Sequence, residues 1–282
     1  MTATKSQIIF LRQRVGGIFF AGKIFVAAKK SVEVKRKSVI DLRFKFWGAL
    51  FAILSAISFL LPLNVASAEK TIIILVRHGE TEYNKTHRYQ GALDIPLNET
   101  GLHQADLLAE RLKDVPIDVF ISSPMQRAYV TTEKVAALHD RTVDYADKRL
   151  SEASYGDWAG KTFKEIEAEH PKEYLLQWKK RWSYTPPNGE SLQSIQKRYR
   201  AVLDDVIEKY PGKTILIGAH SAGNSAVICS LLNIPLKDRY NQIKQDNTCV
   251  NVLEYEDGKW EIRLMNSIDH LGVLYKGMKK AA

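Results

Sequence analysis

The stretch Thr71-Ile72-Ile73-Ile74-Leu75-Val76 is followed directly by Arg77-His78. A short, continuous run of apolar residues, with no polar residue at alternate positions, is typical of a strand that is buried on both faces. Such strands belong to sheets that carry helices on both sides, because only there does neither face of the strand meet water. The sequence therefore predicts a buried strand at residues 71–76 with a charged and a titratable side chain at its carboxyl end.

The rest of the chain alternates between strand and helix patterns. Further strands are predicted at 118–122 and 214–218, and a terminal hairpin at 250–255 and 260–265 with Asp257-Gly258 in its turn. Helices are predicted at 102–112, 123–139, 162–182, 191–209 and 222–232, with Ser123 as the N-cap and Pro124 as the first residue of the second. This alternation predicts a three-layer α/β/α sandwich around a mainly parallel central sheet.

The composition is that of a globular protein. The chain has 282 residues, of which 45% are hydrophobic and 26% charged, and this excludes collagen-like, low-complexity and wholly disordered proteins. The net charge of +9 comes from residues 1–68, which hold 11 Lys and Arg against two acidic residues, so that 30 basic and 30 acidic residues remain in 69–282. We therefore expect no nucleic-acid partner and no membrane-binding surface on the folded domain.

The basic N-terminal region resembles a targeting segment. Residues 39–68 combine basic residues, an uncharged apolar centre from Phe46 onwards, and Ala66-Ser67-Ala68, the pattern of a cleaved signal peptide. The alternative is an uncleaved membrane anchor, because the apolar span is long enough to cross a bilayer. Residues 1–38 are an N-terminal extension, either untranslated because translation starts further in, or a poorly ordered leader. We expect an exported protein, periplasmic or extracellular, that contacts a membrane only through this segment.

The cysteines and the possible metal-binding residues place few constraints on the predicted structure and function. Cys229 and Cys249 both lie in apolar stretches, where a buried free thiol is the commoner state, although export would permit a disulfide between them. The sequence contains no CxxC or HExxH motif and no Cys/His cluster, so we expect no bound metal. The oligomeric state is left open.

Two arginines and two histidines follow the carboxyl ends of three predicted strands. Arg77 and His78 follow the first strand, Arg127 lies early in the helix after the second, and His220 follows the third. The carboxyl ends of parallel strands meet at one edge of a sheet, so we expect these side chains to lie together. Arginine forks and helix N-termini favour phosphate, and a neutral imidazole is a nucleophile at physiological pH. The sequence therefore predicts a phosphate site.

Leu75-Val76-Arg77-His78-Gly79-Glu80-Thr81, with Asn84 after it, resembles the signature of the histidine phosphatase superfamily, in the branch that contains cofactor-dependent phosphoglycerate mutases and related phosphatases. The resemblance continues in order to residue 271, through 88–91, 94–97, 122–128, 150–152, 156–160, 189–191, His220, Asn266 and 270–271. Residues 69–282 are therefore expected to form one histidine phosphatase domain.

The resemblance implies a two-step phosphoryl transfer without a cofactor. His78 attacks the phosphorus, and Glu152 protonates the leaving oxygen and then deprotonates the attacking water. Arg77, Arg127 and His220 hold the phosphate oxygens. The substrate-binding residues implied by the same motifs are Asn84, Thr81, Gln90, Gly91 and Ser221. A glycine usually follows the second histidine in this family, so Ser221 either narrows the phosphate pocket or adds a hydrogen bond.

Two other activities stay open at this point. Ala219-His220-Ser221-Ala222-Gly223 is similar to the nucleophile elbow of α/β-hydrolases, which would make Ser221 an esterase nucleophile with His270 as its base. A phosphoglycerate mutase-type phosphotransferase is the nearer alternative. Tyr155-Gly156-Asp157-Trp158-Ala159-Gly160 is similar to the phosphatase relatives, which favours an exported phosphomonoesterase acting on a small phosphorylated metabolite. The substrate itself is not specified by the sequence.

Overall fold

The computed structural model describes residues 69–174 and 183–272. The predicted N-terminal extension, 1–38, and the predicted signal peptide or anchor, 39–68, lie outside the described residues. Within the described ranges, no helix combines the length and the apolar character needed to cross a bilayer.

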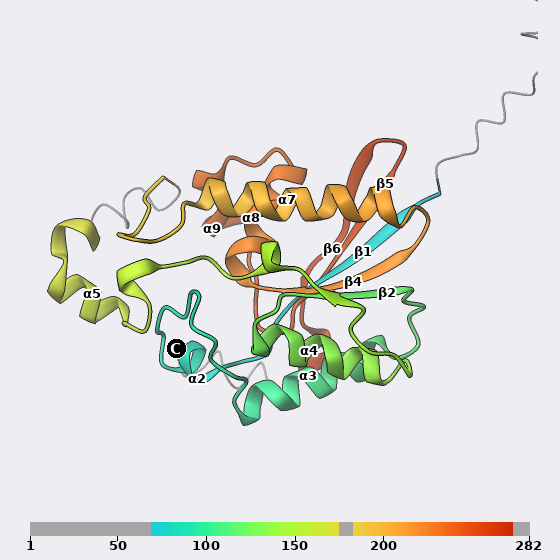
Figure 1. The fold of residues 1–282 in the computed structure, drawn as a ribbon, viewed down its shortest axis with the longest axis horizontal. Coiled ribbons are helices and arrows are strands. Elements are labelled where there is room, and N and C mark those ends of the chain that lie inside the picture. The colour runs from blue at the N-terminus through green and yellow to red at the C-terminus, as the bar shows by residue number, and fades with distance from the viewer. Residues whose placement is uncertain (1–68, 175–182, 273–282) are drawn as a thin grey trace, which may run out of the picture. The chain divides into compact units, whose positions relative to one another are not determined.

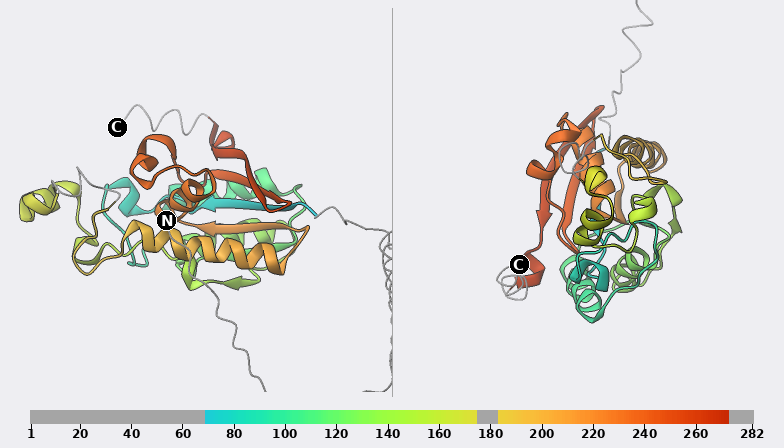
Figure 2. Two further views of the ribbon diagram at one scale, coloured as in Figure 1. Left: turned by 90° about the horizontal axis from the view of Figure 1, so that it is seen from above. Right: turned by 90° about the vertical axis from the view of Figure 1, so that its left-hand side faces the viewer.

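A six-stranded sheet forms the centre of the domain. Its strands are β1 (Thr71–Arg77), β2 (Val119–Ser122), β3 (Tyr145–Ala146), β4 (Thr214–Ala219), β5 (Val250–Glu256) and β6 (Lys259–Ser267). The order across the sheet is β3-β2-β4-β1-β5-β6 (Figure 2). The first four strands of this order run parallel to one another, whereas β5 is antiparallel to β1 and β6 to β5. The mainly parallel sheet is confirmed, and the predicted terminal hairpin forms its antiparallel part.

Helices cover the two faces of this sheet. The longer helices are α3 (Glu99–Leu112), α4 (Gln126–Ala137), α7 (Leu192–Lys209) and α8 (Ser221–Leu231), and the shorter ones are α2 (Glu82–Lys85), α5 (Phe163–Glu169) and α9 (Arg239–Gln242). Figure 1 shows α7 on one side of the sheet and α3 with α4 on the other. The predicted three-layer α/β/α sandwich is confirmed.

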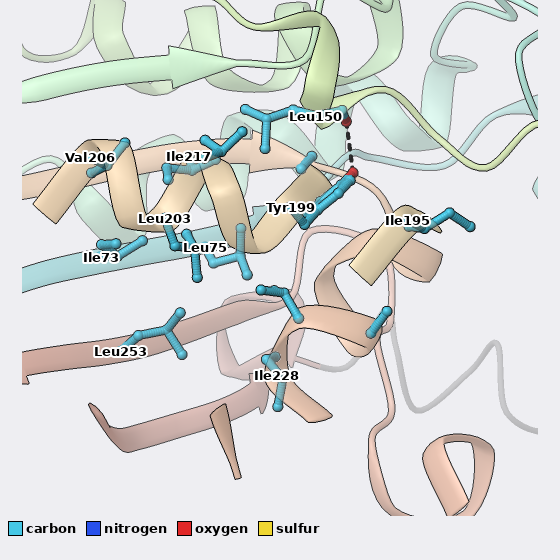
Figure 3. Close-up of a cluster of buried hydrophobic side chains, with 14 of the residues drawn as sticks. Ile73, Leu75, Leu150, Ile195, Tyr199, Leu203, Val206, Ile217, Ile228 and Leu253 are labelled. Carbon is cyan, nitrogen blue, oxygen red and sulfur yellow. Dashed lines mark hydrogen bonds between the residues drawn. The ribbon is translucent and has the colours of Figure 1, made fainter. Parts of the chain in front are cut away.

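The continuous apolar run of β1 supplies both cores. Ile73 and Leu75 pack into the cluster beneath α7 and α8, whereas Ile74 and Val76 pack against α3 and α4. Successive side chains of a strand point to opposite faces, so a strand covered on both sides has no position for a polar residue. Figure 3 shows Ile73 and Leu75 in the first cluster, together with Tyr199 of α7.

Three predicted helices have clearly different bounds in the structure, and two of these differences lie next to a proline. The helix expected from residue 102 starts at Glu99. The helix expected from Ser123 starts at Gln126, and Met125 is its N-cap. Ser123 continues the strand pairing, since it donates its N–H to the Gly218 carbonyl at 2.8 Å. The helix expected over 162–182 is interrupted after Glu169, because His170 precedes Pro171 and adopts φ −138°, and helical structure resumes at 171–174. Residues 175–182 lie outside the described residues.

The turn of the terminal hairpin follows its sequence signal. Asp257 and Gly258 both adopt positive φ, of 49° and 77°, as the two-residue turn between twisted antiparallel strands requires. Cys229 and Cys249 are both buried and free, so the structure contains no disulfide between them.

Candidate active site

Three neighbouring strands end at the same edge of the sheet, and the polar residues that follow them form the site. Arg77 pairs with Ala219 at the end of β1 and β4, and Ser122 pairs with Gly218 at the end of β2 and β4. His78, Ser123 and His220 are the residues that directly follow strands β1, β2 and β4. The register therefore aligns the strand ends, and parallel strands bring their carboxyl ends to one place.

His78 is buried and its ring has a defined orientation. Its Nδ1 lies 2.6 Å from the Gly79 carbonyl oxygen, and since a carbonyl only accepts, Nδ1 carries the proton. The lone pair is therefore on Nε2. Burial, followed by the positive charges of Arg77 and Arg127, lowers the pKa of His78 well below its ordinary value. The ring is thus a neutral imidazole with a nucleophilic Nε2 at physiological pH.

Backbone carbonyls accept hydrogen bonds from the terminal nitrogens of both arginines and so fix their guanidinium groups. Arg77 donates from Nη1 to the Gln245 carbonyl at 2.7 Å. Arg127 donates from Nη1 to the Leu93 carbonyl at 2.8 Å and from Nη2 to the Gly91 carbonyl at 3.0 Å. Burial lowers the pKa of both guanidinium groups, and the negative charge of Glu152 acts in the opposite direction on both. The structure therefore fixes one half-buried and one buried cation within the electrostatic reach of one carboxylate.

His220 completes the group. Its ring centroid lies 5.2 Å from that of His78, and its Nε2 lies 2.8 Å from the Ser123 hydroxyl. Burial, then the charge of Arg127, lowers the pKa of His220 well below its ordinary value. Both histidines are therefore neutral, and the positive charge of the site comes from the arginines alone.

Three buried nitrogens in this group have no hydrogen-bond partner in the part of the chain that the structure describes: Nε of Arg77, Nε of Arg127 and Nδ1 of His220. Buried donors without a partner are unfavourable and are found where a ligand supplies the acceptor. The two arginine nitrogens are donors in every protonation state. The arrangement therefore suits an oxyanion bound among these side chains.

A family model described as the histidine phosphatase superfamily (branch 1) matches residues 73–268. The chain belongs to this superfamily. Phosphoserine phosphatase 1 of Hydrogenobacter thermophilus is 33% identical over 214 residues, which cover 74% of this chain and 98% of that protein.

Solved structures of this superfamily superpose on the domain. A mutant phosphoserine phosphatase from Entamoeba histolytica in complex with phosphoserine has a TM-score of 0.64 at 29% identity, covering 71% of this chain and 99% of that one. The mycobacterial glucosyl-3-phosphoglycerate phosphatase has a TM-score of 0.64 at 28% identity, covering 70% and 99%. The chain is a phosphatase of this superfamily.

The other residues expected to bind phosphate or substrate in this histidine phosphatase form one linked segment after His78. Thr81 is the N-cap of α2 and donates its hydroxyl to Gln90 Oε1 at 2.8 Å. Asn84 Oδ1 accepts the Thr81 N–H at 3.2 Å, so its Nδ2 is the part of the side chain suited to a phosphate. Gly91 adopts φ +53° and offers its carbonyl to Arg127. The contacts of Thr81, Gln90 and Gly91 thus go to Asn84, to one another and to Arg127, and they position these side chains.

Ser221 starts α8, directly after His220. The proposed esterase pair of Ser221 with His270 finds no support in the geometry. His270 is engaged through both ring nitrogens, by Thr248 Oγ1 at 3.0 Å and by Arg111 Nη1 at 3.1 Å. Its segment packs against α3, on the face of the sheet opposite α8.

Several residues that position the site in this histidine phosphatase carry no local sequence signal. The Thr131 hydroxyl accepts the Gly79 N–H at 3.1 Å, and Asn247 Nδ2 donates to the His78 carbonyl at 3.0 Å. The Ser123 hydroxyl, expected to cap a helix, accepts the Met125 N–H at 3.3 Å and also contacts His220 at 2.8 Å. Among the residues described, no group of three or more acidic, histidine or cysteine side chains is placed to hold a metal ion.

Proposed function

We propose that this phosphatase hydrolyses small phosphate monoesters through a phosphohistidine on His78. The observation that carries the proposal is the neutral His78 ring, with its lone pair on Nε2, beside three buried nitrogens that lack a partner among the described residues. Phosphoryl transfer depends mainly on positioning and on positive charge around the equatorial oxygens. Arg77 and Arg127 supply that charge, and Nδ1 of His220 supplies a neutral donor when the Ser123 hydroxyl donates to Nε2.

The first step forms a bond between Nε2 of His78 and phosphorus and breaks the bond from phosphorus to the ester oxygen. Glu152 gives its proton to that oxygen, so the product leaves as an alcohol. In the second step the Glu152 carboxylate takes a proton from water, which attacks phosphorus on the side opposite His78. Inorganic phosphate leaves, His78 is neutral again and Glu152 is again protonated. A general acid and base of this kind contributes roughly 10²–10⁴-fold to the rate.

The names of the relatives suggest the first substrates to test. One solved relative is a complex with phosphoserine, and the same phosphatase is also described in complex with 3-phosphoglyceric acid. Both molecules are phosphate esters of three-carbon carboxylic acids. We propose this class of ester as the starting point for this chain.

We also propose that the protein is exported. The basic residues, the apolar segment and Ala66-Ser67-Ala68 within 39–68 support a signal peptide cleaved before Glu69. N-terminal sequencing of the protein from its native cells tests this. A mature chain that starts at Glu69 is expected, an uncleaved chain in the membrane fraction would instead support an anchor, and an uncleaved soluble chain would contradict export.

Release of phosphate from phosphoserine, without added metal, tests the catalytic proposal. We expect His78→Ala to abolish turnover and the matched variant His103→Ala, at an exposed position of α3, to retain it. A phosphoryl adduct on the wild-type protein, detected by intact mass and absent from His78→Ala, is the second expected result. Hydrolysis that survives His78→Ala would refute the proposal. Interconversion of phosphoglycerates with a bisphosphate primer, without hydrolysis, would support the mutase alternative.

A further inference from the structure

The segment that carries Glu152 has no regular secondary structure of its own. It follows the short 3-10 helix Lys148–Leu150 and continues without helix or strand to Gly156. Glu152 Oε1 accepts the N–H of Ala153 at 2.9 Å, so its carboxyl orientation depends on the backbone around it. A proton donor must be held close to its target orientation to be effective. The segment therefore needs an external support.

Helix α7 provides that support through two successive residues. Arg198 donates from Nη1 to the carbonyls of Arg149 and Ser151, both at 2.6 Å, and from Nη2 to the carbonyl of Glu152 at 3.2 Å. The Tyr199 hydroxyl donates to the Leu150 carbonyl at 2.7 Å, as Figure 3 shows. Four consecutive carbonyls that end at Glu152 are thus bound from one side by α7.

Glu190 fixes Arg198 in this position. Its two carboxylate oxygens accept Nε of Arg198 at 2.9 Å and Nη2 at 2.8 Å, and its N–H donates to the Ser154 carbonyl at 2.8 Å. The two side chains are only 19% and 21% exposed. The five N–H donors of a guanidinium match the five bonds that Arg198 makes. A lysine has three donors on one nitrogen and cannot reproduce this pattern.

We propose that Arg198 and Glu190 position the Glu152 carboxyl for proton transfer to the leaving group, as a clamp on its backbone. The inference rests on the proposed function of Glu152 and extends it to two residues that lie outside the phosphate site. The clamp acts on proton donation and not on phosphate binding, because its bonds to the rest of the site go to the carbonyls of Arg149, Ser151, Glu152 and Ser154 and to none of the residues proposed to bind phosphate.

Leaving groups of different acidity separate this role from a merely structural one. The leaving group of phosphoserine is the serine oxygen, which departs as an unstable alkoxide unless it is protonated. The leaving group of p-nitrophenyl phosphate is p-nitrophenolate, which is stable and needs no acid. The value of kcat/KM reports the first phosphoryl transfer, before water enters. Arg198→Lys and Glu190→Gln are expected to lower kcat/KM for phosphoserine about ten- to a hundredfold, a part of what a general acid contributes. For p-nitrophenyl phosphate we expect less than about a threefold change.

The matched control is Arg200→Lys, since Arg200 lies on the same helix and makes an exposed ion pair with Asp204 at 2.8 Å. We expect it to leave both substrates unchanged. Thermal unfolding of every variant identifies any that fails to fold, in which case Glu190→Asp replaces Glu190→Gln. Equal losses on both substrates, or no loss on either, would overturn the clamp. Glu152→Gln serves as the reference: if it shows no leaving-group dependence itself, the proposed role of Glu152 fails, whatever the clamp variants do.

Discussion

Ser123 and Ser122 are adjacent buried serines whose hydroxyls have different surroundings, and this makes them a matched pair. The Ser123 hydroxyl contacts Nε2 of His220 at 2.8 Å and accepts the N–H of Met125 at 3.3 Å. The Ser122 hydroxyl is contacted by Thr132 Oγ1 at 3.2 Å, which also donates to the Ala128 carbonyl at 2.9 Å. Removing the Ser123 oxygen leaves buried groups without a partner, whereas removing the Ser122 oxygen does not.

These contacts determine how much stability the Ser123→Ala and Ser122→Ala variants are each expected to lose. A buried polar group left unpaired costs about 1–3 kcal/mol, so Ser123→Ala, which affects the His220 ring nitrogen and the Met125 N–H, is expected to lose about 2–4 kcal/mol. Ser122→Ala is expected to lose about 1 kcal/mol or less, because Thr132 keeps its other acceptor. With a urea m-value of about 2 kcal/mol/M, the midpoint falls by about 1–2 M for Ser123→Ala and by at most about 0.5 M for Ser122→Ala.

Urea unfolding and phosphatase kinetics of the two variants check the prediction. Ser123→Ala also releases the His220 ring, and we expect kcat/KM to fall about tenfold, which corresponds to about 1.4 kcal/mol of transition-state stabilisation. Ser122→Ala retains wild-type kinetics. Equal midpoints and equal kcat/KM values for the two variants would refute the idea that Ser123 supports His220.

Three further predictions concern the phosphate site and one loop. Inorganic phosphate at 100 times its dissociation constant is expected to stabilise the fold by about 2.7 kcal/mol, which raises Tm by about 5–11 °C. Arg77→Gln and Arg127→Gln should each reduce this rise in Tm. An undiminished rise in both variants would contradict the proposal that these arginines bind phosphate. Because burial and the two arginines lower the pKa of His78, its ring is expected to stay neutral at pH 6.5, where an ordinary imidazole is half protonated. An NMR titration, with the His78 signal assigned by comparison with His78→Ala, measures this. A His78 ring that is half protonated at pH 6.5 would contradict the burial argument. Gly156 adopts φ +53°, and an added Cβ would lie 1.9 Å from the Pro187 carbonyl oxygen, so Gly156→Ala should lose about 2–4 kcal/mol, and an unchanged Tm would show that the loop can relax.

Five of the six strands in the described sheet were predictable because each is encoded locally, whereas the two-residue β3 has no such pattern. Residues 71–76 and 214–218 are continuous apolar runs, and Asp257-Gly258 has the chemistry of a two-residue turn. The helix boundaries were less accurate where a proline follows a good capping residue or a helical pattern. At His170 the helical pattern continues in the sequence, but the backbone of a residue before proline avoids helical angles.

The meeting of the residues proposed to bind phosphate at one edge of the sheet was predictable for a different reason, which is that parallel strands bring their carboxyl ends together whatever lies between them. The residues that support the site follow no such rule. Asn247 bonds to His78 across 169 positions of sequence, and nothing near Asn247 indicates that contact. Arg198 follows the polar pattern of an amphipathic helix and is expected from that pattern to face water, yet it binds carbonyls of the Glu152 segment.

The strand order also determines when the domain can fold during synthesis. Strand β1 comes first in the domain, but both of its partners, β4 and β5, start only at Thr214 and Val250. Strand β2 likewise pairs with β4. The ribosome therefore completes most of the domain before the centre of its sheet can form, and until then the apolar segments of β1 and β2 have no permanent partner. Such long-range pairing slows folding and exposes the nascent chain to chaperones. If the leader acts as we propose, this delay keeps the polypeptide in the unfolded state that passage through a narrow translocation channel requires.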